Sequence, residues 1–271
     1  MLRLFTAFFV VMIVTGFAAA QAPAASGGAA HTANRPDLSG TWDNGGGVAF
    51  IQPRRNGDSI CLRNCAPEAG ERAAADAASV PQPPRAPSRP SYRPEFAEKV
   101  ADLTARQVEE DPALRCASPG VPRIGLPDKI VQRTDEVVLL YEDLSGNFFR
   151  IVPTDGRPHR TDTEPTHLGD AIGHWEGETL VVETAHFNDE TWLTDDGAFH
   201  TTNLRVVEHL SRTADTLHWS ATVYDPEVLT EPWAVEPRTA KLTKRELIEV
   251  PRCIDQDLDH IVDGSFHPNR R

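Results

Sequence analysis

The stretch LRVVEHLSRTADTLHWSATVY, residues 204–224, decides the fold. Each half alternates apolar and polar side chains with a period of two, which is typical of a half-buried β-strand. Between the halves, Thr213-Ala214-Asp215 predicts a tight turn. Because a short connection joins antiparallel neighbours, the stretch predicts a β-hairpin.

One face of this hairpin is more apolar, and we expect it to point inward. It consists of Leu204, Val206, Glu208, Leu210, Leu217, Trp219, Ala221 and Val223, with Asp225 near the strand end. An inward carboxylate must be paired or hydrogen-bonded, or its pKa rises. Glu208 is therefore either an acid, base or ligand contact in a cavity, or the partner of an inward arginine such as Arg150 or Arg157.

The same period of two recurs on both sides of this hairpin. Further strands are predicted at Trp42, 130–133, 136–142, 147–152, 168–175 and 179–187, with weaker ones at 228–235 and 240–250. Short turns join most of them, for example Thr134-Asp135 and Glu176-Gly177-Glu178. About 8–10 such strands predict an all-β fold, an antiparallel lipocalin-like barrel, with a β-sandwich as the alternative.

The amino terminus predicts export. Residues 1–20 have the form of a signal peptide: Arg3, an apolar run at 4–17 that is too short to span a bilayer, and a small-residue site at Ala18 to Ala20. We expect residues 21–36 to form a flexible leader, 37–253 a single barrel domain and 254–271 a tail. We expect a periplasmic or secreted protein.

A Pro-rich, helix-containing insertion at 43–127 interrupts the barrel. Its prolines gather at 80–94, where they exclude a central strand or a helix interior. The pattern that starts at Pro94 predicts one amphipathic helix of about 15 residues, which ends at Asp111-Pro112.

Composition excludes several functions. The chain has 271 residues and a formal net charge of −13, which disfavours nucleic acid and anionic membranes as partners. It contains no glycine-rich nucleotide motif and no regular metal-ligand spacing, so we predict no cofactor and no metal. The expected partner is a small molecule, and the oligomeric state is left open.

In an oxidising compartment, the four cysteines are expected to form disulfides. An even number favours disulfides, and we predict Cys61–Cys65 as a local loop and Cys116–Cys253 as a long staple. A zinc site is the alternative, but Cys61-x3-Cys65 is not the usual C-x2-C spacing.

Most of the ten histidines lie in the region of the hairpins, where they suit proton transfer. The candidate catalytic residues are His159, His174, His186, Glu208 and Asp225. The candidate substrate-binding residues are Arg157, which would hold an anion, and the aromatic residues Trp175, Phe187, Trp192 and Trp219. The alternative is that the aromatic residues are ordinary core and that His167, His186 and His200 are plain surface residues.

Three motifs carry a resemblance: PDLSGTW at 36–42, DGRPH at 155–159 and GHWEGETLVVET at 173–184. Together they resemble an uncharacterised family of secreted bacterial proteins, from which no catalytic residue is carried over. More loosely, Gly40-Thr41-Trp42 is similar to the G-x-W of lipocalins and other calycins. That likeness implies that Trp42 closes the base of an eight-stranded barrel that holds one small ligand. The long insertion departs from a simple lipocalin.

Three functions follow as hypotheses. The first is a lipocalin-like protein that binds a small, partly apolar molecule in a cavity lined by histidine, carboxylate and tryptophan. The second is a cofactor-independent acid–base enzyme (a lyase, isomerase or hydrolase) that acts in the same cavity. The third is an envelope-associated interaction protein, which predicts a filled barrel.

Overall fold

The computed structural model describes residues 35–43, 89–143, 145–250 and 253. The predicted signal peptide, most of the leader, the Cys61–Cys65 pair and the tail lie outside the described residues. The domain bounds and the bounds of the insertion stay predictions.

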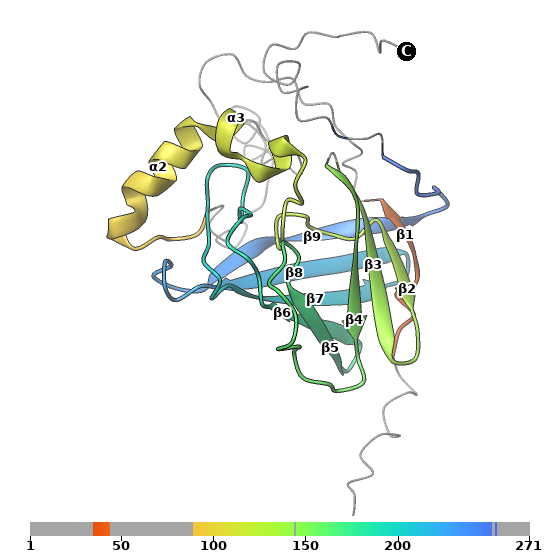
Figure 1. Cartoon of the computed structure of the whole chain (residues 1–271). Helices are drawn as coiled ribbons and strands as arrows, with labels where there is room; N and C mark the ends of the chain where they lie inside the picture. Colours follow the sequence, from red (N-terminus) through yellow and green to blue (C-terminus); the bar gives the residue numbers. More distant parts are fainter. Residues whose placement is uncertain (1–34, 44–88, 144, 251–252, 254–271) are drawn as a thin grey trace, which may run out of the picture. The chain divides into compact units, whose positions relative to one another are not determined.

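Nine antiparallel strands form one sheet (Figure 1). They are β1 Gly40–Asp43, β2 Lys129–Gln132, β3 Glu136–Asp143, β4 Gly146–Pro153, β5 Asp170–Glu176, β6 Thr179–Ala185, β7 Arg205–Thr213, β8 Thr216–Tyr224 and β9 Trp233–Thr243. Their order is β4-β3-β2-β1-β9-β8-β7-β6-β5, and the sheet curls into a nearly closed barrel. The prediction of an all-β antiparallel barrel is confirmed.

The seam of the barrel lies between the two end strands, β4 and β5. No ladder joins these strands in the described part of the chain, so side chains close the seam. Gly173 on β5 makes this approach possible, because a Cβ atom at this position would lie 2.8 Å from Cγ1 of Val152 on β4. The interior of the barrel is therefore bounded at the seam by packing rather than by backbone hydrogen bonds.

The predicted inward face of β7 and β8 is confirmed. Val206, Leu210, Leu217 and Val223 are completely buried, and Glu208 is 1% exposed among them. The adjacent positions of β7, such as Val207 and His209, are only partly buried. The alternation therefore places one carboxylate inside an otherwise mostly apolar stretch of the barrel.

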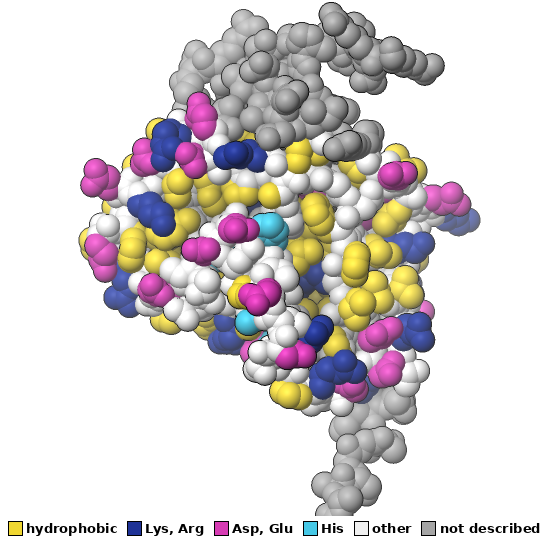
Figure 2. Space-filling view, in the orientation of Figure 1, with side chains coloured by type: hydrophobic (Ala, Val, Ile, Leu, Met, Phe, Trp, Pro, Cys, Tyr) yellow, Lys and Arg dark blue, Asp and Glu magenta, His cyan; other side chains and the backbone are white. Residues whose placement is uncertain are grey.

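The outer surface of the barrel is not uniformly polar. Phe149 and Ile151 on β4 are 61% and 50% exposed, and Val131 on β2 is exposed as well. Figure 2 shows hydrophobic side chains gathered over the region of β3 and β4. On these strands an apolar side chain is therefore not always a buried one.

The last part of the sheet differs from prediction. One strand, β9, replaces the expected strands at 228–235 and 240–250, and 244–250 has no strand. Pro237 lies within β9, although proline cannot donate to a ladder. The pairing of β8 with β9 shifts between Trp219 and Ala221, which are opposite Arg238 and Val235. This bulge accommodates the proline, so the strand continues through it.

The predicted single helix of the insertion is broken. Its parts are the 3-10 turn η2 Pro94–Phe96, the helix α2 Ala97–Ala105, the short α3 Gln107–Glu110 and η3 Pro112–Arg115. The break falls at Arg106, whose φ of −107° and ψ of 28° are not helical.

The insertion is anchored by two kinds of contact. Tyr92 stacks on Phe199, with ring centroids 5.2 Å apart. Arg123 makes a buried ion pair with Asp111 at 2.7 Å and a second one with Asp195 at 2.6 Å. Aromatic packing and paired charges thus hold residues 92–123 against the loop that follows β6.

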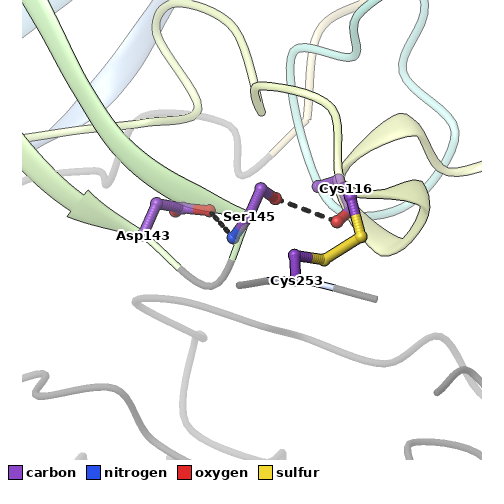
Figure 3. Close-up of a disulfide and its surroundings, with 5 residues drawn as sticks. Cys116, Asp143, Ser145 and Cys253 are labelled. Atoms are coloured by element: carbon purple, nitrogen blue, oxygen red, sulfur yellow. Dashed lines mark hydrogen bonds between the residues drawn. A yellow bond between two sulfur atoms is a disulfide. The ribbon is translucent and has the colours of Figure 1, made fainter. Parts of the chain in front are cut away.

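The disulfide Cys116–Cys253 is confirmed, with a Cα–Cα distance of 5.5 Å (Figure 3). Next to it, the Ser145 hydroxyl donates to the backbone oxygen of Ala113 at 3.0 Å. Cys253 lies beyond β9. None of the helices in the described residues is long and apolar enough to cross a membrane.

We expect the double variant C116S/C253S to be less stable than the wild type. The disulfide closes a loop with a sequence separation of 137. Its loss should therefore lower the free energy of unfolding by up to about 5 kcal/mol on the chain-entropy model. Urea unfolding under non-reducing conditions measures this difference. Equal midpoints for variant and wild type would contradict a bond between these two cysteines.

Candidate functional site

Five polar side chains from five strands meet inside the barrel, and we call them the core polar cluster. They are Tyr141 on β3, Arg150 on β4, Thr184 on β6, Glu208 on β7 and Trp219 on β8. All five are buried. Each occupies an inward position of its strand, so side chains from five strands meet at one place inside the barrel.

The centre of the core polar cluster is an ion pair. Nη2 of Arg150 lies 2.6 Å from Oε2 of Glu208, so the second alternative for Glu208, pairing with an inward arginine, is confirmed for Arg150. Arg150 also donates to the Tyr141 hydroxyl at 3.2 Å and to the Thr184 hydroxyl at 2.6 Å. The indole N–H of Trp219 donates to Oε1 of Glu208 at 3.0 Å. The pair therefore ties β4 to β7.

One atom of this pair keeps unused hydrogen-bonding capacity. Nε of Arg150 is buried and has no hydrogen-bond partner among the described residues. Oε2 of Glu208 is paired with Nη2 of Arg150 at 2.6 Å. The hydroxyl of Thr154, just beyond β4, is also buried without a partner. Each such group costs about 1–3 kcal/mol, and charged groups cost more.

The charges of the cluster are set by its surroundings. Burial raises the pKa of the Tyr141 hydroxyl to about 12; the Arg150 charge opposes the rise and the Glu208 charge adds to it. Burial disfavours the charged form of Arg150, but the Glu208 carboxylate keeps its pKa above the usual value. At neutral pH the cluster thus presents a protonated phenol and a charged guanidinium.

Sequence reasoning found part of this cluster. Of the predicted site residues, the structure brings together Glu208 and Trp219. Tyr141 and Thr184 were missed, although each continues an inward alternation, as Thr184 does after Leu180 and Val182. They were missed because the sequence does not show which strands face one another across the barrel.

His159 lies elsewhere, on the outside of the sheet. Its Nδ1 is 2.8 Å from Oδ2 of Asp170, and its Nε2 is 3.5 Å from Oε1 of Glu183. Arg205 pairs with the other oxygen of Glu183 at 3.2 Å. The three positions Asp170, Glu183 and Arg205 occupy the outward faces of β5, β6 and β7. Sequence reasoning did not select Asp170 as the partner of His159.

Three other predicted residues have local partners. His174 is 60% exposed and lies 3.0 Å from Glu176. Arg157 is 56% exposed and pairs with Asp155, so it is not the partner of Glu208. His186, directly after β6, contacts the backbone oxygen of Thr163 through Nε2 at 2.5 Å.

The remaining predicted residues pack in loops or at the edge of the core. Asp225 is buried and accepts hydrogen bonds from the backbone N–H of Thr201 at 2.7 Å and from its hydroxyl, which fixes the loop before β7. Phe187 and Trp192 are buried core residues, whereas Trp175 is only partly buried and packs against the core. Their expected role in substrate binding stays a prediction.

The alternative that His200 is a plain surface residue is wrong, because His200 is 2% exposed. Its Nδ1 lies 3.0 Å from the backbone oxygen of Thr201, which can only accept, so Nδ1 carries the proton. Nε2 then accepts from the Thr191 hydroxyl at 2.8 Å. Burial lowers the pKa of His200, against the opposing effect of the Thr201 hydrogen bond.

Within the described ranges, no three His, Cys, Asp or Glu side chains are placed to hold a metal ion together. The comparisons with known proteins give no match: no family model, no curated protein and no solved structure is significantly similar to the chain.

We expect the single variant R150M to lower the free energy of unfolding by about 3–5 kcal/mol, because it leaves the Glu208 charge buried without an opposite charge. The double variant R150M/E208L removes both charges and should recover most of this loss. Urea unfolding measures both. As a matched control, R157M removes an exposed arginine and should change little. A double variant less stable than R150M would contradict the coupling of the two charges.

His200 should make stability depend on pH. Its pKa is lowered in the folded state, so the unfolded chain binds the proton more readily. The stabilisation is fully present above the unfolded value of about 6.5 and is lost as the pH falls from there toward the folded pKa. Urea unfolding between pH 7.5 and 5 should show a shallower decline for H200Q than for the wild type. Parallel curves would contradict this role.

Proposed function

We propose that the chain binds a small, partly apolar molecule inside the barrel and that the core polar cluster holds the polar group of that molecule. One observation carries the proposal: Nε of Arg150 is buried without a hydrogen-bond partner among the described residues. A folded protein rarely leaves a buried N–H group in this state. A bound molecule that supplied the missing acceptor would remove the cost.

The surroundings of the cluster suit the rest of such a molecule. Val152, Val182, Val206 and Leu139 are completely buried on the strands that carry the cluster. Binding sites for small molecules typically combine apolar walls with a few convergent polar groups, and barrels commonly provide them. An antiparallel barrel with one polar cluster inside it is compatible with this use.

The enzyme hypothesis has less support. An acid–base mechanism needs two titratable groups within hydrogen-bond reach of each other and of a substrate. Among the described residues, no hydrogen bond or ion pair joins His159, His174 or His186 to Glu208 or Asp225. Glu208 is engaged by Arg150 and Trp219, and Asp225 by Thr201. Binding alone requires no such pair.

We also propose that the chain works in an oxidising compartment outside the cytoplasm. The disulfide between Cys116 and Cys253 supports this proposal, because such bonds form and persist in oxidising compartments. The form of residues 1–20 supports it independently.

Fluorescence titration with the neutral apolar probe N-phenyl-1-naphthylamine tests interior binding. We expect saturable binding of one probe by the folded full-length chain. Val182 is completely buried and opposite Glu208 in the ladder, so V182F places a bulky ring beside the cluster and should weaken binding at least tenfold. V207F adds the same ring on the outward face of β7 and is the matched control.

Two results would overturn interior binding: no saturable binding by the wild type, or equal binding by V182F and V207F. Circular dichroism establishes that each variant is folded. If V182F does not fold, A221V makes a smaller addition, since Ala221 is buried and lies opposite Glu208 on β8.

A further inference from the structure

The outward face of β2, β3 and β4 carries adjacent apolar side chains, which we call the outer apolar patch. It consists of Val131, Val138, Leu140, Phe149 and Ile151. Val131, Val138 and Ile151 form one row across the three strands, and Leu140 lies beside Phe149 in the next row. Phe149 and Ile151 are 61% and 50% exposed. Adjacent exposed apolar side chains of this kind mark a surface for another segment or molecule.

The last described residues of the chain lie next to this patch. The backbone N–H of Val250 donates to Oδ1 of Asn147 at 2.8 Å, and Nδ2 of Asn147 donates to the backbone oxygen of Ile248 at 3.1 Å. Asn147 lies on β4, two residues before Phe149 and on the same outward face. Cys253 is three residues beyond Val250, so it lies at most about 11 Å from it. Residues 254–271 therefore start near one end of the outer apolar patch.

The start of residues 254–271 is held in place by a covalent bond. Cys253 is joined to Cys116, and Ser145, in the turn that leads into β4, bonds to the nearby Ala113 (Figure 3). The eighteen residues that follow Cys253 are long enough to return along β4, because an extended chain covers about 3.3 Å per residue. Length and starting point thus allow this segment to reach Phe149 and Ile151.

The sequence of this segment matches the patch. Within IDQDLDHIV, residues 254–262, the apolar residues follow the i, i+4, i+7, i+8 pattern of an amphipathic helix: Ile254, Leu258, Ile261 and Val262. Gly264 follows, as is typical just after a helix end. Nine helical residues are about 14 Å long. The stretch of β4 from Asn147 to Ile151 covers about 13 Å, so the two apolar faces agree in length.

Charge agrees with this pairing. On the helical projection, Asp255 and Asp257 flank the apolar face on its two sides. Lys129 on β2 lies opposite Leu140, in the same row as Phe149. A helix on the patch therefore brings acidic side chains toward a basic one at its rim.

Two physical reasons favour this segment over a separate partner. A tethered segment has an effective concentration on the order of millimolar, which a free partner does not reach. A second copy of the chain would bring its own net charge of −13, so the two copies repel one another. Five side chains are also far fewer than the roughly 20–30 residues that each partner contributes to a stable interface.

We propose that residues 254–262 dock as an amphipathic helix on the outer apolar patch, with Leu258 and Ile261 against Phe149 and Ile151. The chain thereby covers its own exposed apolar surface. This contact lies on the outside of the barrel and does not depend on binding in the interior.

Photocross-linking of the full-length chain tests the contact. Phe149 is replaced by the photoreactive p-benzoyl-L-phenylalanine, which keeps an aromatic ring at an exposed position. After irradiation, reduction and trypsin digestion, we expect mass spectrometry to find cross-links to the peptide of residues 253–270. The control is the same replacement at the exposed His218 on β8, which at least three strands separate from β4 in either direction around the barrel. It should give no cross-link to this peptide.

The alternative occupants give different products. A cross-linked species of twice the mass would show that a second copy covers the patch. Cross-links to residues 1–34 or 44–88 would assign the patch to another part of the chain. Each of these results, or the absence of any cross-link, would overturn the proposal.

Variants of the segment test its apolar face. L258D/I261D places two charges on the proposed contact face, and the yield of the cross-link from position 149 should fall about tenfold or more. Q256D/H260D adds the same two side chains on the opposite face of the helix and should keep most of the wild-type yield. Equal yields for the two double variants would contradict docking through Leu258 and Ile261.

Discussion

The buried ion pair of Arg150 and Glu208 is the interaction on which the barrel depends most. It joins β4 to β7 near the seam where no ladder connects β4 to β5. Two isolated charges in an apolar core would each be very costly, so the strands must keep the positions that let the charges meet. A shift of β7 by one residue would turn Glu208 outward and leave Arg150 alone. The ion pair therefore fixes the register of β7 as well as the closure of the barrel.

The hairpins could be predicted because their signals are local. In residues 204–224 the alternation and the turn lie within one stretch, and the observed β7 and β8 follow it closely. Two features needed tertiary information. The bulge that admits Pro237 into β9 depends on the partner strand, and the helix break at Arg106 is not marked by glycine or proline.

The candidate site could be predicted only in part, for a related physical reason. Alternation shows that Glu208 and Trp219 point inward, and the cost of a buried carboxylate requires a partner. It does not show which strands face one another, so Arg150 remained one of two candidates, and Tyr141 and Thr184 were missed. Closeness in sequence does not bring the histidines into one site. His159, His174, His186 and His200 each contact a different partner.

The central claim is that the unused Nε–H group of Arg150 in this ion pair binds a ligand. The most direct measurement is the ¹H–¹⁵N NMR signal of the Arg150 Nε–H in the full-length chain, recorded during addition of 1-decanol, a neutral, apolar probe whose oxygen can accept a hydrogen bond. A new hydrogen bond donated by Nε–H to the ligand oxygen should shift this proton downfield and slow its exchange with water as binding saturates. An unchanged Arg150 Nε–H signal while 1-decanol is bound would contradict the claim.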